Sequence, residues 1–281
     1  MSGHVPTQNG RVPTHFSVDQ PAPHHHREIA ESFGGEAERY DRTRPRYPKD
    51  LAEQILAGLP GNRTLDVGIG TGLSAIPFRE AGADVVGVEV DERMAEVARA
   101  RGFEVAVTSF EHWDAEGRQF DAVVSGQTWH WIDPRGGARK AGDLLRPGGR
   151  FAAFWNVADP PRDVALAFAE MYRSLDTGLP FVPWARPTSE GYDRILGTAA
   201  EGLRETGSFP EQRRLDLEWQ AVITRDAWLE QVPTMGGHNR IPEAQLARLL
   251  RGLGEVVDEN GGSFAMRYTT VALVADRLSA G

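Results

Sequence analysis

The sequence contains no cysteine. A chain without thiols can form no disulfide framework, no thiolate metal site and no cysteine nucleophile. The composition therefore excludes small disulfide-stapled folds and enzymes that attack their substrates with a thiolate. It also fits the reducing conditions of the cell interior, so we expect a cytoplasmic protein.

Long apolar runs and an excess of positive charge are missing as well. No apolar stretch approaches the roughly 20 residues that a membrane-spanning helix requires, so we expect no association with a membrane. Lys and Arg number 31 against 40 Asp and Glu, and the formal net charge at pH 7 is −9. Such a chain is poorly suited to long contacts with nucleic acid phosphates, so we expect no nucleic acid partner, although a local basic patch stays open.

The first 26 residues are rich in Pro, His, Gly and Gln and lack the apolar core of a secretory signal. We interpret residues 1–26 as a flexible tail and residues 27–281 as a single domain. Three adjacent histidines at 24–26 bind metal opportunistically at best in such a tail, so we expect no metal. The apolar spacing over 27–40 predicts an amphipathic helix, which could close this chain's own site or join two copies as a homo-oligomer.

The most informative stretch runs from Thr64 to Gly72 and reads TLDVGIGTG. A short apolar strand leads into glycines at every second position, and the residues after them can open a helix. Glycine suits a turn that brings backbone against a ligand, because a Cβ would obstruct the ligand and the turn often needs a positive φ. A second apolar strand ends in Glu89, where a ribose would need a hydrogen-bond acceptor. The pattern predicts a nucleoside-binding βαβ unit, although the glycines could also serve the turn alone.

Further strands are predicted in alternation with helical stretches, at 103–107, 120–125 and 150–155. This alternation indicates right-handed crossovers and a doubly wound parallel α/β sheet, with ligands at the carboxyl ends of the strands. Residues 157–209 leave the rhythm and hold two helical stretches, and we interpret them as a helical lid over the same edge. Two closing strands are predicted at 215–224 and 264–276, with a helix at 242–253 between them.

Four blocks occur in a fixed order: 66–72 (DVGIGTG), Glu89, 120–125 (FDAVVS) and 144–149 (LLRPGG). In this order they resemble the signature of class I S-adenosylmethionine-dependent methyltransferases, of the small-molecule group often called type 11. The resemblance implies a seven-stranded, mostly parallel Rossmann-like sheet in the order 3-2-1-4-5-7-6. It also implies S-adenosylmethionine as cofactor and S-adenosylhomocysteine as product. The resemblance fails across 157–209, where the acceptor would be chosen.

The resemblance assigns ten residues to the cofactor: Tyr40, Asp66, Gly68, Gly70, Gly72, Glu89, Phe110, Glu111, Ser125 and Gly126. The glycines would pass beneath the methionine moiety, and the last two residues of the set would offer backbone carbonyls to its amino group. Asp66 would orient the loop and the ammonium end, and Glu89 would accept both ribose hydroxyls. Phe110 and Glu111 would bracket adenine, although Phe110 can equally belong to the core and Tyr40 to ordinary packing.

Five residues are predicted to contact the acceptor: Tyr47, Trp129, Asn156, Phe181 and Trp184. They stand at the exits of the fourth and fifth predicted strands and within 157–209, apart from Tyr47, which precedes the first strand. Together they would make an aromatic cavity, which suits a bulky, partly apolar small molecule better than a sugar or a phosphate ester. Trp131 and Trp155 stand nearby, and core packing explains those two as well as a site role does.

His130 and His238 are the candidate catalytic bases, because histidine titrates near neutral pH. His130 follows the fourth predicted strand, and His238 is flanked by glycines that would let it reach into a cleft. The alternative for His130 is a structural place, as a helix cap or packed between two tryptophans. Many methyl transfers also need no base.

These patterns predict methyl transfer from S-adenosylmethionine to an oxygen, nitrogen or activated carbon of a bulky, partly apolar small molecule. A catalytically silent cofactor-binding or assembly protein would keep the same glycine turn and Glu89, so it stays an alternative. An NAD-dependent oxidoreductase is less favoured, because the glycine spacing here differs from that of dinucleotide folds.

Overall fold

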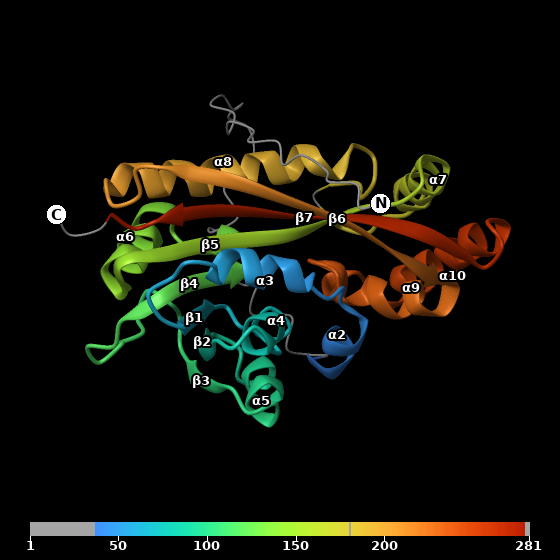
Figure 1. Cartoon of the computed structure of the whole chain (residues 1–281). Coiled ribbons are helices and arrows are strands. Elements are labelled where there is room, and N and C mark those ends of the chain that lie inside the picture. Colours follow the sequence, from blue (N-terminus) through green and yellow to red (C-terminus); the bar gives the residue numbers. More distant parts are fainter. Residues whose placement is uncertain (1–36, 180, 279–281) are drawn as a thin grey trace, which may run out of the picture.

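The computed structural model describes residues 37–179 and 181–278. Their central feature is a seven-stranded sheet in the order β3-β2-β1-β4-β5-β7-β6 (Figure 1). The strands are β1 (Arg63–Val67), β2 (Asp84–Glu89), β3 (Glu104–Val107), β4 (Phe120–Gly126), β5 (Leu145–Asp159), β6 (Gln212–Thr224) and β7 (Ser263–Asp276). The predicted α/β fold and strand order are confirmed. The predicted tail and most of the predicted helix over 27–40 lie outside the described residues, so a homo-oligomer through that helix stays a prediction.

The first five strands of the sheet run parallel, and β7 runs antiparallel to both β5 and β6. Asp66 of β1 pairs with Gly87 of β2 on one side and with Val124 of β4 on the other. The carboxyl ends of these three strands therefore meet at one edge of the sheet. In a doubly wound sheet ligands bind at this edge, where the strand order changes direction between β1 and β4.

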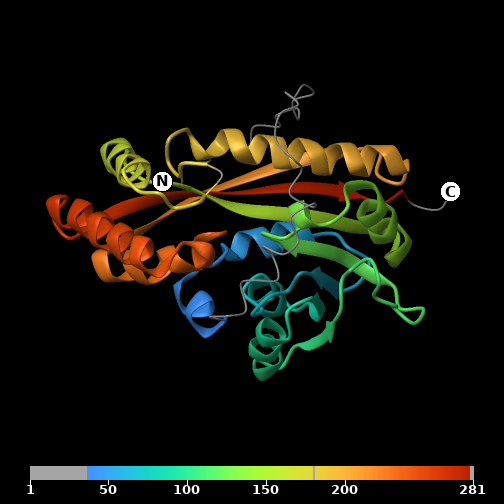
Figure 2. The same ribbon diagram turned by 180° about the vertical axis from the view of Figure 1, so that it is seen from behind.

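Helices cover both faces of the sheet (Figure 2). On one face lie α3 (Lys49–Leu56), α4 (Ala75–Glu80) and α5 (Glu92–Ala100); on the other lie α6 (Pro134–Leu144) and α8 (Thr188–Thr206). Successive side chains of a strand point to opposite faces, so Val123 joins the core beneath α6 and α8 while Val124 joins the core beneath α3 and α4. Both faces are apolar because both are buried, which explains the nearly continuous apolar runs of β1, β2 and β4.

The last three strands are 13 to 15 residues long, against four to seven residues for β1 to β4. Their projecting ends carry a third apolar core together with α7 (Arg162–Arg173), α9 (Arg225–Gln231) and α10 (Glu243–Glu259). Phe168 of α7 stacks on Trp228 of α9 with ring centroids 5.2 Å apart. We call these three helices, with the short turns η4 (Val232–Thr234) and η5 (His238–Arg240), the cap. Figure 1 shows them gathered at one end of the long strands.

Residues 157–209 lie in two places. β5 continues through Asp159, α7 joins the cap, and α8 lies along the sheet beside α6. The buried side chains of α8 share one helix face and are Leu196, Ala199, Ala200 and Leu203. The two helices occur close to the predicted positions, but they do not sit together over the ligand edge. Whether this segment selects the acceptor stays a prediction.

Candidate active site

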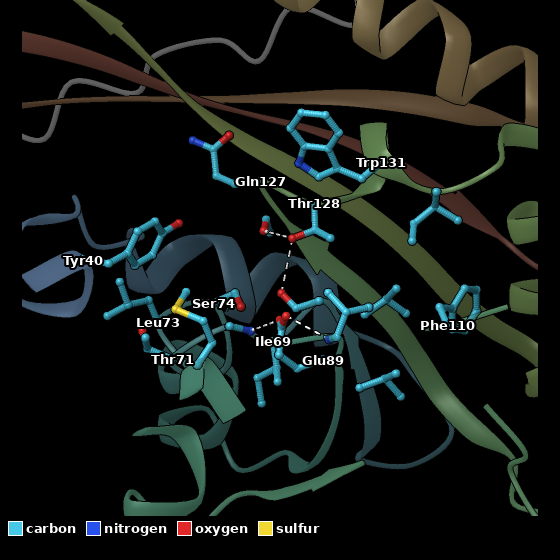
Figure 3. Close-up of a pocket in the computed structure, with 18 of the residues that line it drawn as sticks. Tyr40, Ile69, Thr71, Leu73, Ser74, Glu89, Phe110, Gln127, Thr128 and Trp131 are labelled. Atoms are coloured by element: carbon cyan, nitrogen blue, oxygen red, sulfur yellow. Dashed lines mark hydrogen bonds between the residues drawn. The ribbon is translucent and has the colours of Figure 1, made fainter. Parts of the chain in front are cut away.

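A cavity opens at the edge where β1, β2 and β4 end (Figure 3). The predicted site residues that line it are Tyr40, Tyr47, Gly68, Gly70, Glu89, Phe110, Glu111, Gly126 and Asn156. Residues that line it without having been predicted include Arg44, Ser74, Met94, Gln127 and Thr128, and Trp131, for which a site role and core packing were both open, lines it as well. The glycine loop forms the floor, and α2 (Ala37–Thr43) with the segment after it forms one wall.

The three glycines of the loop adopt left-handed backbone conformations, with φ of +72° at Gly68, +57° at Gly70 and +90° at Gly72. A Cβ on Gly68 would lie 2.1 Å from the side chain of Thr128, and one on Gly72 would lie 2.9 Å from the ring of Phe103. On Gly70 the nearest neighbour would be a methyl carbon at 3.5 Å, so protein atoms leave this side of the loop open. Gly68 and Gly72 thus serve packing as well as the turn, whereas Gly70 presents bare backbone to the cavity.

Glu89 joins the end of β2 to the glycine loop. Its Oε2 accepts a hydrogen bond from the backbone N–H of Gly70 at 2.8 Å. Its Oε1 accepts from the N–H groups of Val90 at 2.9 Å and Asp91 at 3.0 Å. Burial raises the pKa of this carboxyl, while the three backbone bonds act in the opposite direction. A carboxylate accepts about four hydrogen bonds, so about one position is left for a ribose hydroxyl, fewer than the two that were predicted.

Asp66 and Ser125 lie behind the cavity wall and do not line it. The carboxyl of Asp66 is fully buried: Oδ2 accepts a hydrogen bond from Oγ of Ser74 at 2.6 Å, and Oδ1 has no partner in the described part of the chain. Burial raises the pKa of Asp66 to about 7. The Oγ of Ser125 donates to the carbonyl of Val67 at 2.9 Å and so ties β4 to β1. The two residues support the loop from below.

Phe110 and Glu111 form the far end of the cavity, as Figure 3 shows for Phe110. Phe110 is only 2% exposed and also packs against Trp129 with ring centroids 6.0 Å apart. The ring therefore belongs both to the cavity wall and to the core, and its contact with adenine stays a prediction. Lys140 of α6 stabilises this loop, since its Nζ donates to the carbonyls of Glu111 and Trp113.

The part of the cavity lining made by Tyr40, Tyr47, Gln127 and Trp131 is aromatic and amide in character. We call these four residues, with Asn156, the acceptor side. Gln127 has a φ of +55°, a conformation that non-glycine residues rarely adopt and that often marks a functional site. No helical or strand periodicity covers this turn, so only the rule that ligands sit at strand ends could have pointed to Gln127 and Trp131.

The amides of the acceptor side are held by hydrogen bonds. Asn156 accepts at Oδ1 from Oγ1 of Thr270 at 2.7 Å and donates from Nδ2 to the carbonyl of Arg46 at 3.3 Å. Gln127 donates from Nε2 to the carbonyl of Asn156 at 3.4 Å and also hydrogen-bonds Tyr192 of α8. These bonds fix both side chains before any ligand binds.

Three residues predicted to contact the acceptor do not line the cavity. Trp129 lies in η3 (Trp129–Trp131), is 2% exposed and packs edge-on against Phe151 in the core. Phe181 is 55% exposed on the surface. Trp184 packs beside Trp228 of the cap, with ring centroids 6.0 Å apart. In the tight turn after β4 the chain directs the first tryptophan into the core and the second, Trp131, toward the cavity.

The two candidate bases also lie outside the cavity lining. His130 packs against Trp131, and its Nδ1 accepts a hydrogen bond from Nε1 of Trp155 at 3.1 Å. His238 is 2% exposed within the cap, and its Nε2 lies 2.7 Å from the hydroxyl of Tyr172. Burial lowers the pKa of both imidazoles to about 4. Both rings are neutral and committed to packing, which favours the structural alternative for His130.

Hydrogen bonds and ion pairs connect α2 to both sides of the cavity. On the cofactor side, Arg101 pairs with Asp41 of α2 and donates from Nη1 to the carbonyl of Thr71 at 2.7 Å. On the cap side, Arg42 donates from Nε to Glu230 of α9 at 2.8 Å. The helix carries Tyr40 and therefore holds this aromatic wall between the glycine loop and the cap.

Two kinds of feature are absent from residues 37–179 and 181–278. None of the helices there has the length and apolar character of a membrane span. No group of three His, Asp or Glu side chains is placed to hold a metal ion in the same residues.

Known proteins share both the sequence blocks and the fold. A family model described as "Methyltransferase domain" matches residues 65–153. An uncharacterized methyltransferase of Mycobacterium tuberculosis is 27% identical over 260 residues, which cover 89% of this chain and 97% of that protein. A putative type II methyltransferase from Anaeromyxobacter dehalogenans matches in structure with a TM-score of 0.62 at 21% identity, covering 84% of this chain and 99% of that chain. This chain is a class I S-adenosylmethionine-dependent methyltransferase.

The methyltransferase uses S-adenosylmethionine, and its cavity has features that fit the cofactor. A phosphoethanolamine N-methyltransferase of Haemonchus contortus, solved with S-adenosylhomocysteine, has the same fold at a TM-score of 0.50 and 16% identity, covering 90% of this chain and 59% of that chain. Gly70 leaves its side of the loop open and the carboxylate of Glu89 is fixed beside it, while the contact of Glu89 with the ribose stays a prediction. Asp66 supports the lining from behind, because it accepts a hydrogen bond from Ser74, which lines the cavity.

Proposed function

We propose that this methyltransferase transfers the methyl group to an oxygen, nitrogen or activated carbon of a bulky, partly apolar small molecule. The observation that carries the proposal is the aromatic acceptor side, which is continuous with the cofactor end of one cavity. Tyr40, Tyr47 and Trp131 supply flat apolar surface, and the amides of Gln127 and Asn156 lie beside them. Such a lining suits a planar molecule with a few polar groups.

The cofactor supplies an electrophilic methyl group on a sulfonium sulfur. The side chains of the chain bring the acceptor atom in line with that methyl and exclude water, which is how proximity accelerates a displacement. The faces of Tyr40 and Tyr47 also suit a positively charged sulfonium. Gln127 is fixed by its own hydrogen bonds, so it can orient the acceptor without rearranging.

The acceptor side offers no group that removes a proton at neutral pH. Burial raises the pKa of the Tyr47 hydroxyl well above its ordinary value, so this hydroxyl donates hydrogen bonds and stays protonated. His130 and His238, the candidate bases, are neutral with a pKa of about 4 and lie outside the lining. An acceptor that is already nucleophilic near neutral pH, or that gives its proton to solvent, fits this arrangement best.

The segment 157–209 would shape the acceptor side through Tyr192 of α8. Tyr192 hydrogen-bonds Gln127, and it packs against the core that contains the sheet and α6. Phe181 and Trp184 would act at most indirectly, because neither lines the cavity. Acceptor choice would thus depend on α8 more than on the loop before it.

An assay of S-adenosylhomocysteine release tests the proposal, with one-ring and two-ring phenols, carboxylic acids, amines and carbon acids as acceptors. We expect turnover with a two-ring acceptor. Trp131→Ala should lower kcat/KM for it by roughly tenfold or more, with little change in affinity for S-adenosylhomocysteine. Phe181→Ala is the matched control and should leave both values unchanged, because its ring is exposed. Binding of S-adenosylhomocysteine without turnover of any acceptor would favour the silent cofactor-binding protein instead.

A further inference from the structure

Arg44 is the cation among the described residues that line the cavity. It follows α2 directly, and its guanidinium lies over the ring of Tyr40, 4.7 Å from the ring centroid. One Nη donates to the carbonyl of Thr234 in the cap. Its Nε is shielded from solvent and has no hydrogen-bond partner in the described part of the chain.

No carboxylate of the described residues forms an ion pair with Arg44. Other arginines, such as Arg42 and Arg99, do pair with acids, and they do so on the surface. The acids that line the cavity are Glu89 and Glu111, which belong to the ribose and adenine ends. A half-buried guanidinium without an anion, with one shielded N–H that makes no hydrogen bond, costs stability, so such a group points to a ligand that supplies both.

We infer that Arg44 forms an anion-binding subsite of this cavity and that its ligand is a carboxylate. One guanidinium balances one negative charge, and no second cation lines the cavity in the described residues to meet the roughly two charges of a phosphate monoester. The planar guanidinium also matches the planar carboxylate.

The carboxylate has two possible sources. The amino-acid end of the cofactor carries one, and Tyr40, beneath the guanidinium, lines the cavity near the glycine loop (Figure 3). An acidic acceptor carries another, and the charge of Arg44 also acts on Tyr192, which hydrogen-bonds Gln127 on the acceptor side. The second source rests on the proposed function, whereas the first does not.

Two pairs of ligands, each a carboxylate with a counterpart that lacks the carboxylate, separate the sources by calorimetric titration. The first pair is S-adenosylhomocysteine and its decarboxylated analogue, S-adenosyl-3-thiopropylamine. The second pair is 1-hydroxy-2-naphthoate and 1-hydroxy-2-naphthamide, titrated with the cofactor end saturated by S-adenosylhomocysteine. Each protein is judged by the ratio of its two affinities within a pair, so a general loss of binding or folding cancels.

Wild type should prefer the acid in at least one pair by about 10- to 100-fold, and Arg44→Met should abolish that preference. Arg44→Lys should keep part of it, since it keeps the charge without the planar fork. Arg46→Met is the matched control: Arg46 is an exposed arginine two residues away that does not line the cavity, and its loss should change neither ratio.

Loss of the preference in the first pair identifies the cofactor as the source, and loss in the second identifies an acidic acceptor. The inference is overturned if Arg44→Met keeps every preference that wild type shows, or if wild type prefers the acid in neither pair. Failure of the proposed function would look different: wild type would methylate no acceptor at all, while the first pair could still be measured.

Discussion

Replacement of Asp66 by Asn should make the ligand-free protein more stable at neutral pH. The carboxyl is fully buried, with one oxygen bonded to Ser74 and the other without a partner in the described residues. Burial raises its pKa from 3.8 to about 7. Between these two values the folded protein holds a proton that the unfolded chain has released, so the free energy of unfolding falls as pH rises through this window.

The size of the effect follows from the two pKa values. A difference of about 3 in pKa corresponds to about 4 kcal/mol once the pH is above 7, and relaxation around the ionised group reduces it. Asn keeps an acceptor for Ser74 and never ionises. We therefore expect Asp66→Asn to equal wild type in stability near pH 4 and to exceed it by about 2 to 4 kcal/mol near pH 7.5.

Urea unfolding of both proteins without ligand, at several values between pH 4 and 8, measures this difference. A stability difference that does not change with pH, or a variant less stable than wild type at pH 7.5, would refute the reasoning.

Three further substitutions test other parts of the site. Glu89→Ala should weaken S-adenosylhomocysteine binding by about 10- to 100-fold, since the carboxylate braces the glycine loop and is predicted to accept a ribose hydroxyl; near-normal affinity in a calorimetric titration would contradict that role. Asp41→Asn should speed release of S-adenosylhomocysteine several-fold, because it breaks the ion pair with Arg101 that holds α2. Stopped-flow displacement measures this release rate, and an unchanged rate would contradict the prediction. His130→Ala should lower Tm but change kcat by less than about tenfold, because the ring accepts a bond from Trp155 outside the cavity; a loss of 100-fold or more with a flattened acid limb of the pH profile would restore it as the base.

The glycine loop and its place at the cavity could be predicted from the sequence because the parts are local. A strand, a glycine turn and a helix are consecutive in the chain, and the rule that ligands lie at strand ends places Gly68 and Gly70 at the cavity. Glu89 lies one crossover further on, at a strand end that parallel pairing brings alongside β1. What the sequence did not reveal was that Glu89 braces the loop, since that depends on which backbone N–H groups point at it.

The acceptor side could not be predicted in the same way. Trp129 and Trp131 stand two residues apart in the same sequence segment. Only the fold of the short turn decides that the first ring enters the core and the second lines the cavity. The placement of Trp184 depends on Trp228 of α9, far along the chain, so no local pattern reveals it. Arg44 lies in the Arg-Pro stretch before the first strand, and the sequence alone does not distinguish it from Arg46. The structure does, because Arg44 lines the cavity and Arg46 is exposed outside it.

The position of α2 has a kinetic consequence. The helix is bonded to the glycine loop through Asp41 and to the cap through Arg42, and it places Tyr40 in the wall that both ligands share. Displacing it would uncover the cofactor end and the acceptor end in one movement. We therefore expect the dissociation rates of the demethylated cofactor and the methylated product to change together when the bonds of Asp41 or Arg42 are altered. One opening movement of α2 would then limit both dissociation steps.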